Sequence, residues 1–148
     1  MNFNTFSSFM HVILDSAVFI NATSFSFSKK DIYYVTLSCD AEVKENLARL
    51  RLEAASHEYD FHFQDPCMAT IAVVRSLANK YGVKRLSSAD ESVIGLALEL
   101  VERKEKVKVF TDDYSIQNVL KWRKIPFSGI LQSGIQKSRS FAKKRKAT

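Results

Sequence analysis

The segment from Val107 to Asn118 changes from a strand pattern to a helix pattern at two adjacent carboxylates, Asp112 and Asp113. Residues 107–110 are mostly β-branched or aromatic, as in a buried strand, and apolar residues return at helical spacing after Ser115. Both carboxylates therefore stand at the carboxyl end of a strand, where a helix begins. In open α/β sheets this edge binds ligands, so the segment constrains both the fold and the place of a site.

The rest of the chain alternates strand and helix patterns. Further strands are expected at 11–14, 32–35, 59–63 and 127–131. Helices are expected over 17–20, from Asp40 through Arg51 or further, from Asp65 to Gly82, from Ser88 to about Lys104, and after Asp113. Strands that alternate with helices form parallel sheets, which right-handed crossovers cover on both faces. The sequence therefore predicts a three-layer α/β/α sandwich with a central parallel sheet.

Local signals mark the ends of several expected helices. Asp65 and Pro66 supply a cap and a first-turn proline, and Gly82 is a natural stop. Ser88 and Glu91 have the spacing of a capping box. In the helix from Asp40, one face is expected to carry Val43, Leu47 and Leu50.

Length and composition indicate one globular domain. The chain has 148 residues, of which 46% are hydrophobic, and a chain of this size buries roughly 70% of its unfolded surface. Cys39 and Cys67 form neither a metal-ligand spacing nor a disulfide framework, which favours a reducing compartment. No apolar run approaches the roughly 20 residues of a membrane span, and the N-terminus lacks signal-peptide features. We therefore expect a cytoplasmic protein that does not contact a membrane.

The net charge of +6 lies at the C-terminus. Its six basic residues are Lys137, Arg139, Lys143, Lys144, Arg145 and Lys146. Without them the chain has 16 basic and 16 acidic residues. A basic arm on a neutral body favours a polyanion such as RNA, although a solvated end explains the charge equally well. We expect a flexible extension at 1–9, a folded domain at 10–131 and a basic, disordered tail at 132–148, with Met10 as an alternative start.

Carboxylates recur where the predicted strands end and the helices begin. They are Asp15, Asp112 and Asp113 after strands, Asp90 in a first helical turn, and Glu42 or Glu45 early in the second helix. Parallel strands share one carboxyl edge, so these acids can converge. A hard divalent cation relieves their repulsion, and Mg²⁺ or Mn²⁺ prefers such oxygen ligands. Zinc is disfavoured because no histidine or cysteine cluster is present.

Each acid also has an ordinary structural explanation. Asp90 favours a helix dipole, Asp15 suits a turn, and Asp113 suits an Asx-type cap. Glu42 and Glu45 are of a type that usually faces solvent. Taken singly, the structural explanation is the stronger one, and their joint arrival at one sheet edge is what favours a metal site.

Four of these acidic segments resemble those of PIN-domain ribonucleases. They are residues 12–17 around Asp15, a glutamate in the second helix, residues 86–90 and residues 111–113. More narrowly, residues 86–100 and the string Thr-Asp-Asp-Tyr-Ser-Ile-Gln-Asn at 111–118 are similar to the Nob-type endonucleases, which mature the 3′ end of small-subunit ribosomal RNA. The similarity spans roughly residues 10 to 130.

The resemblance implies roles for individual residues. The implied catalytic acids are Asp15, Glu45, Asp90 and Asp113, and the implied metal ligands are Asp15, Asp90 and Asp113, with Asp112 assisting. Glu45 fits the family pattern of a valine two residues earlier, but Asn46 replaces the usual aliphatic residue after it, so Glu42 stays open. Ser16 and Thr111 are expected to hydrogen-bond the acids or an ordered water.

The resemblance also implies an activity and partners. The expected activity is a Mg²⁺- or Mn²⁺-dependent endoribonuclease that acts in 3′-end maturation of 16S rRNA and leaves 5′-phosphate and 3′-hydroxyl ends. The alternatives are a VapC-like toxin ribonuclease and a PIN-derived RNA-binding module without catalysis. Family members continue into a four-cysteine zinc ribbon that this sequence lacks, so pre-ribosomal proteins or a separate zinc-ribbon chain are expected partners. The oligomeric state is open, a homodimer included.

Overall fold

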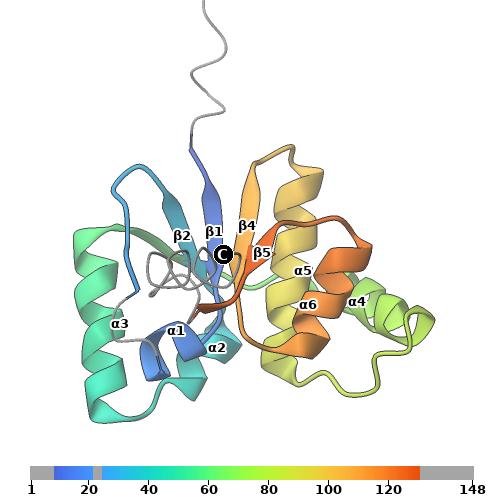
Figure 1. Ribbon diagram of the computed structural model, residues 1–148, viewed down its shortest axis with the longest axis horizontal. Helices are drawn as coiled ribbons and strands as arrows, with labels where there is room; N and C mark the ends of the chain where they lie inside the picture. The colour runs from blue at the N-terminus through green and yellow to red at the C-terminus, as the bar shows by residue number, and fades with distance from the viewer. Residues whose placement is uncertain (1–8, 22–24, 131–148) are drawn as a thin grey trace, which may run out of the picture.

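The computed structural model describes residues 9–21 and 25–130. A five-stranded parallel sheet with the order β3-β2-β1-β4-β5 forms its centre (Figure 1). The strands are β1 (His11–Leu14), β2 (Ile32–Val35), β3 (Asp60–Phe63), β4 (Val107–Phe110) and β5 (Phe127–Ser128). The predicted tail at 132–148 and the extension at 1–9, apart from Phe9, lie outside the described residues, so both stay predictions.

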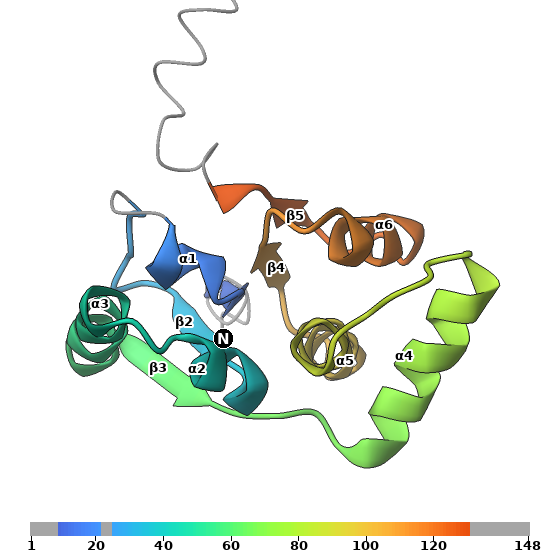
Figure 2. The ribbon, with the colours of Figure 1, turned by 90° about the horizontal axis from the view of Figure 1, so that it is seen from below.

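Helices cover both faces of this sheet. They are α1 (Ala17–Ile20), α2 (Leu37–Glu42), α3 (Asn46–Glu58), α4 (Met68–Lys80), α5 (Ser88–Glu102) and α6 (Tyr114–Trp122). Figure 2 shows α1 and α3 on one face, α5 and α6 toward the other, and α4 outside α5. The central strand β1 is apolar on both sides, with Val12, Ile13 and Leu14 at most 2% exposed, as expected of a strand between two helical layers. The predicted three-layer α/β/α sandwich is confirmed.

The predicted helix from Asp40 is wrong in extent and in phase. Thr36 caps α2, and a separate helix, α3, starts after Glu45. Val43 enters the core between them, 1% exposed, and its conformation interrupts the helix. The interruption resets the helical phase, so Leu47 and Leu50 are 56% and 61% exposed. The buried residues of α3 are instead Ala48, Leu52 and Ala55.

Two predicted helix starts are also displaced. Helix α4 begins after Cys67, and Asp65 instead accepts a hydrogen bond of 2.8 Å from the backbone N–H of Leu37, at the start of α2. The cap of helix α5 lies one residue earlier than predicted, because Ser87, and not Ser88, caps the helix and forms the capping box with Asp90. The predicted stop at Gly82 agrees with its positive φ of 71°.

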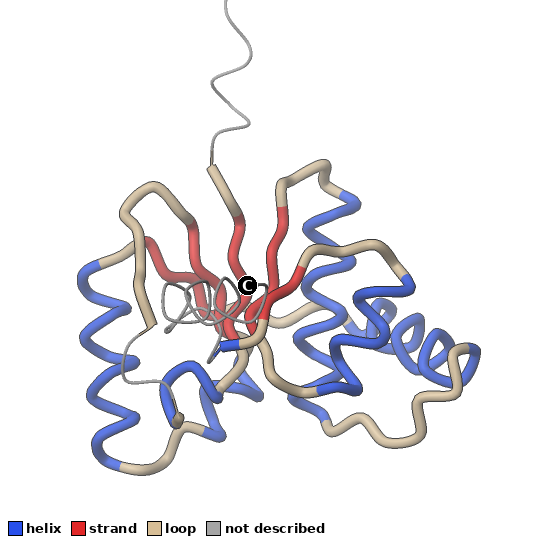
Figure 3. Tube along the Cα trace, viewed as in Figure 1, coloured by secondary structure: helices blue, strands red, loops and turns tan. Residues whose placement is uncertain are grey.

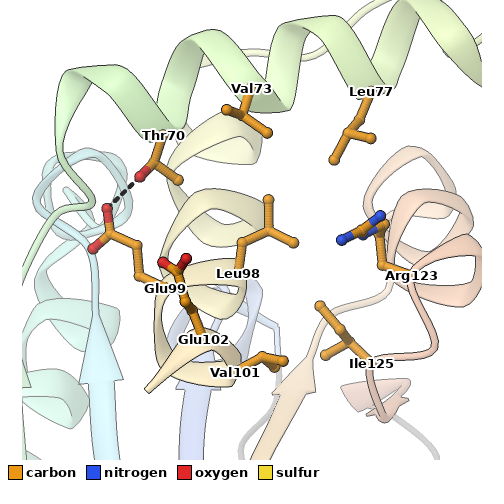
Figure 4. A pocket seen from close by; sticks show the side chains of 9 residues that line it. All are labelled: Thr70, Val73, Leu77, Leu98, Glu99, Val101, Glu102, Arg123 and Ile125. Atoms are coloured by element: carbon orange, nitrogen blue, oxygen red, sulfur yellow. Dashed lines mark hydrogen bonds between the residues drawn. The ribbon is translucent and has the colours of Figure 1, made fainter. Parts of the chain in front are cut away.

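Polar contacts help to join helix α4 to α5. Thr70 donates a hydrogen bond of 2.6 Å to Glu99 (Figure 4), and Arg75 pairs with Glu91 at 2.9 Å. Gly95 on α5 permits the approach, because a Cβ atom there would lie 2.9 Å from Cγ of Pro66. A hollow of about 420 Å³ opens beside this contact, and none of the predicted site acids lines it. Within the described part of the chain, no helix is long and apolar enough to span a membrane.

Candidate active site

Asp15 lies at the centre of the carboxyl edge of the sheet. Its backbone N–H donates to the carbonyl of Phe110, which joins the end of β1 to the end of β4. Its side chain accepts short hydrogen bonds from the hydroxyl of Thr111, at 2.7 Å from Oδ2, and from the N–H of Ser16, at 2.8 Å from Oδ1. The residue is only 8% exposed. Burial raises the pKa of Asp15, and the two hydrogen bonds oppose that rise only in part.

Thr111 connects Asp15 to the acid at the start of α6. Its side chain is fully buried, and its hydroxyl oxygen also accepts the N–H of Asp113 at 3.1 Å. Its own N–H donates to the carbonyl of Ser128, so β5 holds it from the other side. One threonine hydroxyl therefore links the carboxylate of Asp15 to the backbone of Asp113, although the two acids lie far apart in the sequence. The expectation that Thr111 would hydrogen-bond the acids agrees with this geometry.

Asp113 and Asp112 have different contacts. Asp113 caps α6 through Oδ1, which accepts the N–H groups of Ser115 at 2.7 Å and Ile116 at 3.2 Å. Its Oδ2 receives no hydrogen bond from the described residues. Asp112 is exposed, and its Oδ1 accepts the N–H of Ile130 at 2.8 Å. Asp112 thus holds the chain that follows β5, while Asp113 presents a free oxygen beside Asp15.

Asp90 reaches the same edge from the first turn of α5. Its Oδ2 accepts the N–H of Ser87 at 3.0 Å, and its Oδ1 receives no hydrogen bond from the described residues. Burial is the main cause of the raised pKa of Asp90, and the negative charges of Asp113 and Asp15 raise it further. The start of α5 is tied to the end of β2, because Ser92 donates to the hydroxyl of Thr36 at 2.7 Å.

The fourth acid at this edge is Glu42. It lies in the last turn of α2, and its Oε1 accepts the hydroxyl of Ser16 at 2.7 Å. Glu45, which the family pattern favoured, is the exposed N-cap residue of α3, and its side chain makes no hydrogen bond or ion pair within the described residues. The interruption at Val43 separates the two glutamates, because it turns the chain away from the edge after Glu42.

Cys39 also borders Asp15, and no sequence signal indicated it. The Cys39 thiol is fully buried and lies 3.8 Å from Oδ1 of Asp15. Ligand atoms of Asp15, Cys39 and Glu42 all lie within 4.8 Å of one another. Burial, followed by the charge of Asp15, raises the pKa of Cys39 to about 12. Hard cations such as Mg²⁺ and Mn²⁺ prefer oxygen to sulfur ligands, so the carboxylate oxygens are the donors that suit them here.

The acids at this edge suit a hard divalent cation. Glu42, Asp90 and Asp113 each hold one oxygen in a hydrogen bond and leave the other without a partner among the described residues. Asp15 stands between them, and the charges of Glu42 and Asp113 contribute to its raised pKa. A divalent cation would offset this repulsion, and oxygen-rich sets of this kind favour Mg²⁺ or Mn²⁺. The residues present therefore fit a metal ion of this class.

Known proteins resemble this chain in sequence and in fold. A family model described as the PIN domain of ribonuclease matches residues 12–100. The chain is 35% identical over 134 residues to Endoribonuclease Nob1 of Methanothermobacter thermautotrophicus, which covers 90% of the chain and 76% of that relative. It is 33% identical to Endoribonuclease Nob1 of Pyrococcus abyssi, over 86% of the chain and 73% of that relative.

A solved structure adds a likeness in fold. A chain in the structure of VapBC-1 from nontypeable Haemophilus influenzae matches with a TM-score of 0.52 at 12% identity. The match covers 82% of the present protein and 99% of the VapBC-1 chain. At this low identity the likeness concerns the fold alone.

Proposed function

The chain belongs to the PIN-domain ribonuclease family, and we propose that it is an endoribonuclease of the Nob1 type that processes precursor RNA of the small ribosomal subunit. The observation that carries the proposal is the meeting of Asp15, Glu42, Asp90 and Asp113 at one sheet edge. These acids come from four separate elements, and each is oriented by its own hydrogen bond. An ordinary capping role explains one such acid but not the convergence of four.

We propose that Mg²⁺ or Mn²⁺ binds to Asp15, Asp90 and Asp113, with Glu42 as the fourth acid in place of Glu45. When bound, such a cation activates a water molecule and neutralises charge on the scissile phosphate. The protein's own contribution is to orient the ligands. Thr111 and Ser16 hold Asp15, and the Asp113 cap and the Ser87–Asp90 box hold the other two ligands in place before RNA arrives.

The six basic residues of the predicted tail support an RNA substrate. The described chain reaches Ile130, whose N–H is bound by Asp112 at the carboxyl edge. The basic segment from Lys137 to Lys146 therefore follows, in sequence, a residue anchored beside the acids. We propose that this segment binds RNA phosphates next to the cleavage site, and that a separate zinc-ribbon chain or pre-ribosomal proteins add specificity for ribosomal RNA.

Two other activities are less well supported. The toxin alternative is disfavoured because the sequence relatives named here are Nob1 endoribonucleases, whereas the likeness to VapBC-1 concerns the fold alone. An RNA-binding module without catalysis is disfavoured because all four acids are present and oriented by hydrogen bonds. Asp15 is buried, Asp90 and Asp113 are half-buried, and Glu42 lies beside Asp15.

The test is incubation of the protein with precursor small-subunit RNA and Mn²⁺, followed by mapping of the RNA ends. We expect cleavage at a defined position, no cleavage in excess EDTA, and none by Asp113→Asn. The matched control is Asp60→Asn, which removes one carboxylate at the opposite edge of the sheet, where β3 begins, and should cut normally. Undiminished cleavage in EDTA would refute the metal-dependent mechanism.

A further inference from the structure

Tyr114 is an exposed aromatic residue directly beside the proposed metal site. It is the first residue of α6 and follows Asp113 in the chain. Its exposed fraction is 80%, the highest among the exposed large apolar or aromatic side chains of the described residues. No aromatic stacking and no side-chain hydrogen bond involves it within the described part of the chain. Exposing an aromatic ring of this size forgoes the stabilisation that burial would give, which favours a binding role for Tyr114.

The core does not account for Tyr114. Helix α6 buries Ile116, Val119 and Leu120 against the sheet and α5. With 3.6 residues per turn, Tyr114 projects from the side opposite this buried stripe. Replacing it should therefore leave the packing of α6 unchanged.

The backbone that carries Tyr114 is firmly held. Asp113 caps the helix immediately before it, and the amide of Gln117 donates to the carbonyl of Thr111 at 2.8 Å, which closes the first turn. The ring is therefore presented from a rigid turn whose preceding residue is a proposed metal ligand. A base that stacks on the ring would lie near the acids, because Tyr114 is the next residue in the chain after Asp113.

Positive charge also lies near the ends of the elements that meet at this edge. Lys44 follows Glu42 in the connection to α3, and Lys84 and Arg85 precede the α5 cap Ser87. All three are exposed, and none forms an ion pair with another described residue. Such cations are available to the phosphates of an extended RNA strand.

We propose that Tyr114 is a stacking platform for one unpaired nucleobase adjacent to the scissile phosphate. This inference rests on the proposed function and narrows its substrate to single-stranded RNA. A base inside a duplex already stacks on both faces, whereas a splayed base offers a free face to an aromatic ring. The platform tolerates any base, because every base has such a face. It therefore distinguishes single-stranded from double-stranded RNA more than it distinguishes one sequence from another.

The experiment measures binding of short fluorescent RNAs in Ca²⁺, so that the readout does not depend on cleavage. Wild type is compared with Tyr114→Ala, Tyr114→Phe and Trp122→Ala. Trp122 is the matched control, since it is 63% exposed at the other end of the same helix. We expect Tyr114→Ala to weaken single-strand binding by roughly 5- to 150-fold, Tyr114→Phe to bind like wild type, and Trp122→Ala to have no effect. Binding of a duplex RNA should be the same for all four proteins.

A series of single-stranded RNAs, each with one abasic position, identifies the partner base. At one position the missing base should weaken wild-type binding by the same factor as Tyr114→Ala does. The two losses should not add in the Tyr114→Ala protein, because both remove the same contact. Equal affinity of wild type and Tyr114→Ala, or losses that add at every position, would overturn the platform. Absence of cleavage in Mn²⁺ by the wild type would instead count against the proposed function. The binding measurements in Ca²⁺ would still test the platform, because they do not depend on cleavage.

Discussion

Replacing Asp15 by Asn should make the metal-free protein more stable and the metal-loaded protein less stable than wild type. Burial raises the pKa of Asp15, so its ionised form is disfavoured in the folded protein relative to the unfolded chain. A group whose folded pKa is raised contributes stability at low pH, and this contribution is lost as the pH rises through the folded pKa. At pH 7, without metal, wild type therefore holds an unfavourable buried charge that the variant lacks.

The size of the effect follows from two opposing contributions. Asn loses the charge-assisted hydrogen bond from Thr111, which is worth roughly 1.5–3 kcal/mol. It also removes the desolvation of a carboxylate that is 8% exposed and its repulsion by Glu42 and Asp113. Because the pKa is raised despite the hydrogen bonds, the unfavourable contribution is the larger one. We expect a net gain of about 1 kcal/mol, or about 3 °C in Tm for a domain of this size.

Metal should invert this order. A cation at 100 times its Kd stabilises the folded wild type by about 2.7 kcal/mol, or about 8 °C, and the variant loses most of that gain with the central ligand. Thermal unfolding is recorded for both proteins at pH 7 in EDTA and in Mn²⁺, with Asp60→Asn as the control for removal of one charge. In EDTA, lowering the pH from 7 toward 5 should stabilise wild type relative to the variant. A variant that melts below wild type in EDTA and gains equally from Mn²⁺ would refute the reasoning.

Three further predictions test other parts of the molecule. Glu42→Gln should reduce RNA cleavage by at least tenfold while Glu45→Gln cuts at close to the wild-type rate, and a larger loss in Glu45→Gln would restore the assignment that the family pattern favoured. Gly95→Ala should lower the free energy of unfolding by about 1 kcal/mol in urea titrations, because the added Cβ lies 2.9 Å from Pro66. Helix propensity alone predicts a gain in stability, so a stabilised variant would show that the contact relaxes. Deleting residues 136–148 should weaken RNA binding and reduce the slope of log affinity against log salt by up to roughly 4, at about 0.7 per phosphate contact, with cleavage at saturating RNA retained; equal slopes would mean that the tail does not bind RNA.

Local sequence patterns were sufficient for the sheet and for most of the edge. The β-branched and aromatic runs at 11–14, 32–35 and 107–110 became strands at the predicted residues. Such runs can be recognised as strands from the local sequence, because a strand covered on both faces needs apolar side chains at nearly every position. The alternation of these strands with helices then implied a parallel sheet, and Asp15 and Asp113 came to its carboxyl edge as a consequence.

Only the tertiary structure decided which side chains meet. Helix α2 ends where Val43 enters the core, and that packing brings Glu42, and not Glu45, to Ser16. The local pattern around Asp65 suggested a helix start. In the structure, Asp65 follows β3 and accepts a hydrogen bond from the N–H of Leu37, which follows the neighbouring strand β2. Local periodicity carries no information about these contacts, because it describes one segment at a time.

The same limit applies to the centre of the site. Thr111 and Asp15 lie 96 positions apart in the sequence, yet their hydrogen bond orients the central acid. Asp112 and Asp113 are adjacent and chemically identical, and they differ only because one faces Ile130 and the other caps α6. Cys39 touches Asp15 because β2 pairs with β1 and α2 folds back over their ends. The sequence alone therefore predicted that Asp15, Asp90 and Asp113 reach the edge. The packing of strands β1, β2 and β4 with α2 decided the fourth acid and the hydrogen-bond partners of all four, because hydrogen bonds between distant segments exist only after the sheet has set the distance between them.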